Sequence, residues 1–208
     1  MRVYAIVPAR AGSKGLPGKN IKSLAGAPLL KYSIEFAKNL ADVERVFCST
    51  DSAEYAEIAR SCGAEVPFLR SKAASSDTAM EPEVLKDLRD TFKVHDIEEP
   101  DLVVWLRPTF VFRSIKDVTS CIQMLKLDFS MSSARTVCES ESRLYKVQNN
   151  WLNPLFNDGG RSMIRRQDVG VGFKVFSTDV LRFKGNSFGE DFLGRRVGTV
   201  VTNKLCGL

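Results

Sequence analysis

Short apolar runs alternate with amphipathic stretches over the first 125 residues of the chain. Residues 3–7 and 102–106 are continuous apolar runs, which is typical of strands buried on both faces of a parallel sheet. Residues 43–50 and 64–69 are also short and largely apolar, and they predict two further strands. The four runs together indicate a sheet whose centre is buried.

Stretches with helical periodicity separate these runs. Apolar residues recur at helical spacing in residues 28–41, 53–62, 80–92 and 114–125. Pro28 suits the start of the first stretch, Gly63 suits the end of the second, and Ser114 is a good N-cap for the last. Because strands and helices alternate, we predict a doubly wound α/β fold around a mostly parallel sheet.

The rhythm changes after residue 129. Three short β-like stretches follow at residues 130–137, 143–147 and 151–155, with a polar turn at residues 148–150. We interpret about residues 130–165 as a hairpin subregion that leaves the main sheet. Residues 173–176 and 199–202 then resemble returning strands. Since no repeat or low-complexity linker interrupts the chain, we predict one domain over residues 1–208 with this subregion inserted.

The composition narrows the classes of function. Lys and Arg number 30 against 25 for Asp and Glu, and this modest excess forms no basic block of the kind that binds nucleic acid. The first apolar run is too short for a signal peptide, and no run of about 18 apolar residues predicts a membrane span. Five scattered cysteines without a CxxC pair, and a single histidine, argue against zinc and favour a cytoplasmic protein.

The segment directly after the first predicted strand, residues 8–20 (PARAGSKGLPGKN), is the strongest candidate for chemistry. It combines three glycines, which permit close approach of a ligand to the backbone, with three cations. These residues are Gly12, Gly15 and Gly18, and Arg10, Lys14 and Lys19. Open α/β sheets bind ligands at the carboxyl ends of their strands, and cations with backbone amides suit a triphosphate.

Two common phosphate-binding motifs do not match this segment. The glycine spacing differs from GxGxxG, and Ser13 and Asn20 replace the first and last residues of GxxxxGK[ST]. On the residues alone, a solvated turn between strand and helix is the competing interpretation. The fixed order of two cations and an amide after the first strand favours ligand binding.

Residues 9–20 closely resemble the signature of the acylneuraminate cytidylyltransferases, the family of CMP-sialic acid synthetases and their legionaminate and pseudaminate relatives. The resemblance continues at residues 49–52, at Arg70 with residues 74–79, at residues 106–109 with Arg113, and at residues 165–168. It implies a sheet of the nucleotide-diphospho-sugar transferase type. It also implies that CMP passes from CTP to the anomeric hydroxyl of a sialic-acid-like nonulosonic acid, with release of pyrophosphate. Mg²⁺ would be the cofactor, and the hairpin subregion would form a homodimer.

The resemblance implies roles for individual nucleotide-binding residues. Arg10 and Lys14 would hold the CTP phosphates and act in catalysis. The other nucleotide-binding residues would be Ala9, Gly12, Ser13, Asn20, Arg70, Ser76 and Arg107. Ser76 would lie near the cytosine, and Arg107 replaces a Gln that many relatives have beside the base.

The segment that resembles the family's sugar-binding region contains Arg165 and Gln167. The planar guanidinium of an Arg pairs with a carboxylate through two hydrogen bonds, which suits an acidic sugar. From charge pattern alone, Arg165 could equally be a solvated or interface residue. Two departures from the family lie near the expected acceptor: Phe-Val-Phe at residues 110–112 replaces Ser-Pro-Leu, and residues 169–173 replace a longer stretch.

Three alternatives follow from these departures and from the end of the chain. The family takes its metal-binding aspartates from an Asp-x-Asp segment. This segment would begin about where the chain stops at Leu208, so we assign no metal ligand. We expect either a truncated sequence or weakened catalysis. The alternatives are a catalytically weakened CTP- or sugar-binding relative, a cytidylyltransferase for 3-deoxy-manno-octulosonate, and a nucleotidyltransferase for another base.

Several other residues have ordinary structural interpretations. Asp51 could support the loop at residues 8–20 or cap the helix that follows it. His95 lies in a polar stretch and is expected at the surface, whereas Trp105 lies in an apolar strand and is expected in the core. The cysteines are expected to be small core residues and not nucleophiles.

Overall fold

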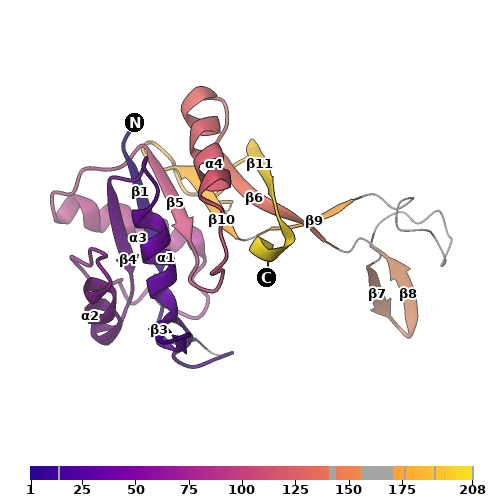
Figure 1. The fold of residues 1–208 in the computed structure, drawn as a ribbon, viewed down its shortest axis with the longest axis horizontal. Helices are drawn as coiled ribbons and strands as arrows, with labels where there is room; N and C mark the ends of the chain where they lie inside the picture. Colours follow the sequence, from indigo (N-terminus) through magenta and orange to yellow (C-terminus); the bar gives the residue numbers. More distant parts are fainter. Residues whose placement is uncertain (14, 141–143, 156–170, 176, 190, 208) are drawn as a thin grey trace.

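The computed structural model describes residues 1–13, 15–140, 144–155, 171–175, 177–189 and 191–207. Within them, a seven-stranded sheet runs in the order β11-β6-β10-β5-β1-β4, with β9 beside β6 (Figure 1). Its strands are β1 (Val3–Pro8), β4 (Arg45–Ser49), β5 (Leu102–Leu106), β6 (Ser133–Ser140), β9 (Gly172–Lys174), β10 (Thr178–Arg182) and β11 (Val197–Thr202). Strands β4, β1, β5, β6 and β11 point the same way, whereas β10 and β9 run against them. The predicted mostly parallel sheet is therefore confirmed.

Helices cover both faces of this sheet. They are α1 (Leu29–Lys38), α2 (Ala53–Ser61), α3 (Glu81–Val94) and α4 (Ile115–Leu127). Because side chains alternate along a strand, Leu102, Val104 and Leu106 of β5 pack in a core with α1, α2 and α4. Val103 and Trp105 of the same strand pack in a second core with α3. The continuous apolar run of β5 thus serves two cores, as a doubly wound fold requires.

The helix boundaries follow the local signals in the sequence. The Ser52 hydroxyl accepts a hydrogen bond from the Tyr55 N–H (3.4 Å), and the Ser114 hydroxyl accepts one from the Asp117 N–H (3.2 Å). Both serines are N-caps, of α2 and α4 respectively. Gly63 follows α2 with a positive φ of 92°, a conformation that favours glycine. None of the described helices is long and apolar enough to cross a membrane.

Strands β7 (Tyr145–Gln148) and β8 (Trp151–Pro154) form a two-stranded sheet of their own. Figure 1 shows this hairpin well apart from the main sheet. Asn149 and Asn150 connect the strands with φ angles of 50° and 65°, and two positive φ angles are what a two-residue type I′ turn needs. The predicted polar turn is confirmed. The smaller elements are β2 (Ser23–Leu24), β3 (Ala27–Pro28), and the 3₁₀ helices η1 (Lys19–Ile21) and η3 (Lys204–Gly207).

The prediction of a strand at residues 64–69 is wrong. Only Glu65 pairs with β4: its N–H donates to the Val46 carbonyl (2.8 Å), and its carbonyl accepts from the Cys48 N–H (3.0 Å). Pro67 has no N–H to continue a ladder, so the pairing ends there. The Arg70 N–H then donates to the Thr50 carbonyl (2.7 Å), which places Arg70 beside the end of β4.

Two strands differ from the sequence interpretation. Residues 130–137 were expected to leave the main sheet, but β6 pairs with β10 and β11 and belongs to it. Within the predicted hairpin subregion, the described strands that stand apart from the main sheet are β7 and β8. Strand β10 was not expected at all, because Thr178, Asp179 and Arg182 interrupt its apolar pattern. Asp179 is nevertheless wholly buried, and the contacts that compensate its burial are formed only in the folded chain.

Candidate nucleotide site

A cavity of about 450 Å³ opens at the carboxyl edge of the sheet, where β1 and β5 end. Its walls come from three segments that are distant in the sequence, within residues 8–20, 70–84 and 105–109. The lining includes the cations Arg10, Lys19, Arg70 and Arg107. This is the edge at which open α/β sheets bind ligands, and the concentration of positive charge suits a polyanion.

The loop after β1 is fixed by side chains from its neighbours. The Ala11 N–H donates to Asp51 Oδ1 (2.9 Å), and the buried Asn20 donates from Nδ2 to the Arg10 carbonyl (3.0 Å). Asp51 therefore supports the loop, which was one of its two predicted roles. The other role, capping α2, belongs to Ser52.

Arg10 joins this loop to the segment before α3. Its Nη1 donates to the carbonyls of Ser76 (2.5 Å) and Ser75 (3.3 Å), and its Nη2 donates to the Gly12 carbonyl (3.2 Å). The Asp77 carboxylate lies 3.3 Å from Nη2 but is half exposed, so water screens this ion pair. Most partners of Arg10 are thus neutral oxygens, and its charge remains available to an anionic ligand.

Arg70 is held in the same manner, by neutral acceptors. Its Nε donates to the Ser49 hydroxyl (3.0 Å), its Nη2 to the Ser49 carbonyl (2.8 Å) and its Nη1 to the Ala74 carbonyl (3.5 Å). Burial lowers the pKa of Arg70, and the nearby Asp51 carboxylate opposes this shift. A phosphate oxygen beside Arg70 would restore the stabilisation that burial removes.

The glycines of the loop have different roles. Gly18 has a φ of 69° at the start of η1, which explains a glycine there. A Cβ at Gly12 or Gly15 would meet no protein atom within 4 Å, so neither glycine is required by packing against the described chain. Both leave the backbone of the loop open to a ligand.

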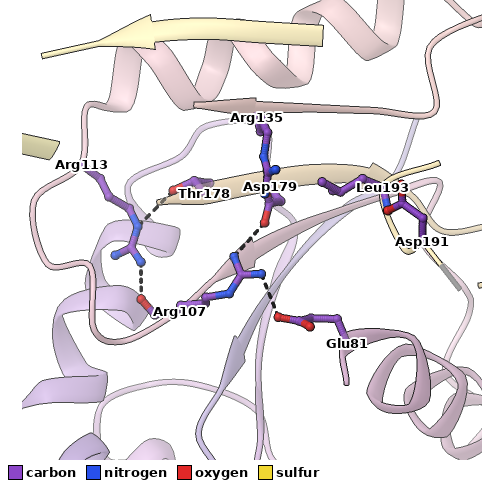
Figure 2. A network of polar contacts seen from close by, with 8 residues as sticks. All are labelled: Glu81, Arg107, Arg113, Arg135, Thr178, Asp179, Asp191 and Leu193. Atoms are coloured by element: carbon purple, nitrogen blue, oxygen red, sulfur yellow. Dashed lines mark hydrogen bonds and ion pairs between the residues drawn. The ribbon is translucent and has the colours of Figure 1, made fainter. Parts of the chain in front are cut away.

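Arg107, at the end of β5, is part of a buried ion-pair network. The register of the sheet sets Asp179 of β10 opposite both Trp105 of β5 and Arg135 of β6. Asp179 is fully buried and accepts from Arg107 Nη1 (2.7 Å) and from Arg135 Nε (2.9 Å). Arg107 Nη2 donates to Glu81 Oε1 (2.9 Å), so Figure 2 shows its guanidinium between two carboxylates. Arg107 is therefore engaged before any ligand arrives.

Arg113 holds the turn that follows β5 through hydrogen bonds. Its Nη2 donates to the Arg107 carbonyl (2.5 Å) and its Nε to the Thr178 hydroxyl (3.1 Å), as Figure 2 shows. Burial, reinforced by the nearby charge of Arg107, lowers the pKa of Arg113 to about 9. These contacts fix the backbone at residue 107 relative to β10.

Comparison with known proteins identifies the family. The model of the cytidylyltransferase family matches residues 4–179. The chain belongs to the cytidylyltransferase family. The CMP-N,N'-diacetyllegionaminic acid synthase of Legionella pneumophila is 39% identical over 127 residues, which are 61% of this chain and 54% of that protein. An N-acylneuraminate cytidylyltransferase of Streptococcus agalactiae is 39% identical over 195 residues, covering 86% of this chain and 46% of that protein.

A solved structure shares the fold of this cytidylyltransferase-family chain. The structure of CMP:2-keto-3-deoxy-manno-octonic acid synthetase complexed with CTP has a TM-score of 0.71 and covers 98% of this chain and 90% of that one. Its sequence identity is 15%, so the likeness concerns the fold. The expected sheet of the nucleotide-diphospho-sugar transferase type is confirmed. The chain spans about half the length of the curated relatives described above.

The structure brings together part of the residue set that the family resemblance suggested. Arg10, Ser13, Asn20, Arg70 and Arg107 line the cavity. Ala9, Gly12 and Ser76 are not among the lining residues: Ala9 is buried, Gly12 accepts from Arg10, and Ser76 is exposed and contributes its carbonyl to Arg10. Lys14, Arg165 and Gln167 lie outside the described residues.

Sequence reasoning missed Glu81, which lines the cavity from the first turn of α3. No motif marked it, because a glutamate at a helix start is common for its favourable interaction with the helix dipole. Trp105 is buried as predicted, and it also forms part of the cavity wall. His95 is exposed as predicted.

The described residues form neither a disulfide nor a preformed cluster of metal-ligating side chains. All five cysteines are free, and burial raises the pKa of Cys48 and Cys121 to about 12, so these two remain neutral thiols at neutral pH. Among the described residues, no group of three or more His, Cys, Asp or Glu side chains could hold a metal ion.

Proposed function

We propose that this protein transfers CMP from CTP to the anomeric hydroxyl of a nonulosonic acid and releases pyrophosphate. The observation that supports this most directly is the cavity at the carboxyl ends of β1 and β5, with Arg10, Lys19 and Arg70 in its lining. Membership of the cytidylyltransferase family supports CTP as the nucleotide. The names of the relatives, a legionaminic acid synthase and N-acylneuraminate cytidylyltransferases, support a nonulosonic acid as the acceptor.

In the proposed reaction, the anomeric hydroxyl attacks the α-phosphorus of CTP and loses its proton, and the bond to the bridging oxygen of the β-phosphate breaks. Negative charge grows on the phosphoryl oxygens and on the leaving pyrophosphate, so fixed cations lower the barrier. Arg10 suits this role because neutral oxygens hold its guanidinium in place without cancelling its charge. We assign Lys14 the same role on the family resemblance, and we assign Arg165 and Gln167 to the sugar acid on the same ground.

Mg²⁺ is the cofactor that we propose for this reaction. In phosphate chemistry this ion is usually bound through substrate phosphates with one or two carboxylates, and it neutralises the phosphate charge. The described residues supply no cluster of metal ligands, so we assign the ion no protein ligand and derive no step through it.

We further propose that the protein works in the cytoplasm as a homodimer that uses the β7–β8 hairpin as its interface. Four apolar side chains of this region are 60–75% exposed: Val147, Trp151, Leu152 and Leu155. Apolar side chains gathered on so small a sheet are typical of an association surface, since two isolated strands are marginal in water. Sedimentation equilibrium should give a dimer for the purified protein and a monomer for Trp151→Glu. A monomeric wild-type protein would contradict this part of the proposal.

The decisive test is pyrophosphate release from CTP in the presence of Mg²⁺ with a panel of acceptors: sialic, legionaminic, pseudaminic and 3-deoxy-manno-octulosonic acids. We expect release with one of the three nonulosonic acids and none when Mg²⁺ is chelated. Release with the octulosonic acid alone would overturn the proposed acceptor. Binding of CTP without release in any combination would favour a catalytically weakened relative instead.

A further inference from the structure

Two carboxylates line the described part of the cavity, Asp77 and Glu81. Asp77 lies beside Arg10, at the cationic side of the cavity. Glu81 is placed differently, beside Arg107, the residue that follows β5. Val84, one helical turn further along α3, and Trp105 of β5 line the same cavity and supply apolar and aromatic surface.

Among the described residues, Glu81 has one hydrogen-bond partner, which holds it in position. Its Oε1 accepts from Arg107 Nη2 (2.9 Å), and the other end of this guanidinium is anchored to the fully buried Asp179 (2.7 Å). No described residue donates a hydrogen bond to Glu81 Oε2. The side chain is 28% exposed, so it is accessible at the cavity wall. Within the described part of the site, Glu81 is therefore a fixed carboxylate with one acceptor oxygen that receives no hydrogen bond.

A free carboxylate oxygen determines which part of a nucleotide can approach it. A phosphate would be repelled, so the triphosphate belongs beside Arg10, Lys19 and Arg70. A pyrimidine ring suits the remaining space, because it can pack against apolar and aromatic side chains such as Val84 and Trp105. The edge of the base that meets Glu81 must then offer a hydrogen-bond donor.

We propose that Glu81 accepts a hydrogen bond from the exocyclic amino group of cytosine and thereby selects CTP over UTP. Cytosine carries an N4 amino donor where uracil carries the O4 acceptor, and an acidic side chain is a natural partner of this amino group. With uracil, two acceptors would face each other and neither could be satisfied, which is costly in a partly buried site. Arg107 is a positioning residue in this arrangement, because it contacts the carboxylate and not the base. This inference rests on the proposed function.

The experiment compares dissociation constants of CTP and UTP, measured by titration calorimetry, for the wild-type protein and Glu81→Gln. Glutamine retains an oxygen for Arg107 but presents an NH₂ donor in place of Oε2. We therefore expect the preference for CTP over UTP to fall by about tenfold or more, through weaker CTP binding and stronger UTP binding. Arg107→Lys should reduce the preference less, since a lysine can hold the carboxylate but not bridge it to Asp179 in the same geometry.

Glu65→Gln is the matched control. Glu65 also pairs with an arginine, Arg45, through Nε (2.8 Å), but it lies beside β4 and does not line the cavity. The control should keep the wild-type preference. An unchanged preference in Glu81→Gln, with a wild-type protein that prefers CTP, would overturn this inference and leave the proposed function standing. A wild-type protein that binds neither nucleotide, or both equally, would overturn the proposed function itself.

Discussion

Arginines occupy two regions of the same cavity, and the two regions differ in what holds the guanidinium groups. Around the loop after β1, Arg10 and Arg70 are held mainly by backbone carbonyls and a serine hydroxyl. At the end of β5, Arg107 lies between two carboxylates, and Arg135 shares one of these, Asp179. Neutral oxygens orient a cation without cancelling its charge, whereas carboxylates do both.

This difference assigns different tasks to chemically identical side chains. In the first region the positive charge is left largely uncompensated, and burial of this charge lowers the pKa of Arg70. In the second region the charges of Arg107 and Arg135 are compensated by Asp179. This pairing allows Asp179 to be fully buried in the middle of the sheet. What separates the two groups of arginines is the charge of most of their partners: neutral oxygens in the first region and carboxylates in the second.

The largest effect is expected for removal of the buried carboxylate of Asp179, which should lower the free energy of unfolding. Asp179→Ala removes the carboxylate that Arg107 and Arg135 share and leaves both guanidinium groups without it. We expect the free energy of unfolding to fall by about 3–5 kcal/mol, measured by urea denaturation. A loss below about 1 kcal/mol would show that the network contributes little and that the two regions do not differ as described.

Removal of a cation from the first region should affect turnover more than stability. For Arg10→Ala we expect a loss on the order of a hundredfold in kcat for pyrophosphate release, because the guanidinium stabilises charge that grows during phosphoryl transfer. Arg60→Ala, on the exposed side of α2, is the control and should keep its activity. Near-normal kinetics for Arg10→Ala would remove Arg10 from the catalytic machinery.

A smaller effect should separate loop support from helix capping at two adjacent residues. Asp51→Ala leaves the Ala11 N–H without its acceptor, so we expect about a tenfold weaker affinity for CTP, in line with a loss of about 1–2 kcal/mol. Ser52→Ala removes the N-cap of α2 and should lower stability by about 1 kcal/mol without changing CTP affinity. Calorimetric titration with CTP and urea denaturation of both variants distinguish the two roles. Equal CTP affinities would contradict the role of Asp51.

The smallest effect is expected for an arginine–carboxylate pair at the surface. Arg45 and Glu65 have side chains that are 33% and 44% exposed, so water screens their attraction. Glu65→Gln should change the free energy of unfolding by less than about 1 kcal/mol. A loss as large as that of Asp179→Ala would mean that burial does not explain the difference between the pairs.

Local patterns in the sequence predict the elements whose signals are continuous. The apolar runs of β1 and β5 and the serine cap of α4 appear in the structure where they are expected, whereas the cap of α2 is Ser52 and not Asp51. The failures occur where the signal is not local. Residues 64–69 have strand-like composition but only Glu65 pairs with β4, and β10 has polar residues in a central strand.

In the candidate site, too, residues with a local sequence signal were predicted and residues whose role depends on distant partners were not. The loop at residues 8–20 was identified from its glycines and cations, because the chemistry of phosphate binding depends on residue types that stand together in the chain. Glu81 was not identified, because its meaning depends on Arg107 and Asp179, which lie 26 and 98 residues further along. The carbonyl of Ser76 holds Arg10, a contact that the sequence does not indicate, and the place of Ser76 near the base stays a prediction.

By itself, the sequence determined the class of fold, the place of the loop rich in glycines and cations, and the resemblance to a family, since each depends on residue order and spacing along the chain. Only the tertiary structure decided which arginines have their charge compensated by a buried carboxylate, because that depends on partners brought together by strand register. Asp179 meets Arg135 and Arg107 through the antiparallel pairing of β10 between β5 and β6. A charge pattern is a property of the chain, but the compensation of a charge is a property of the fold.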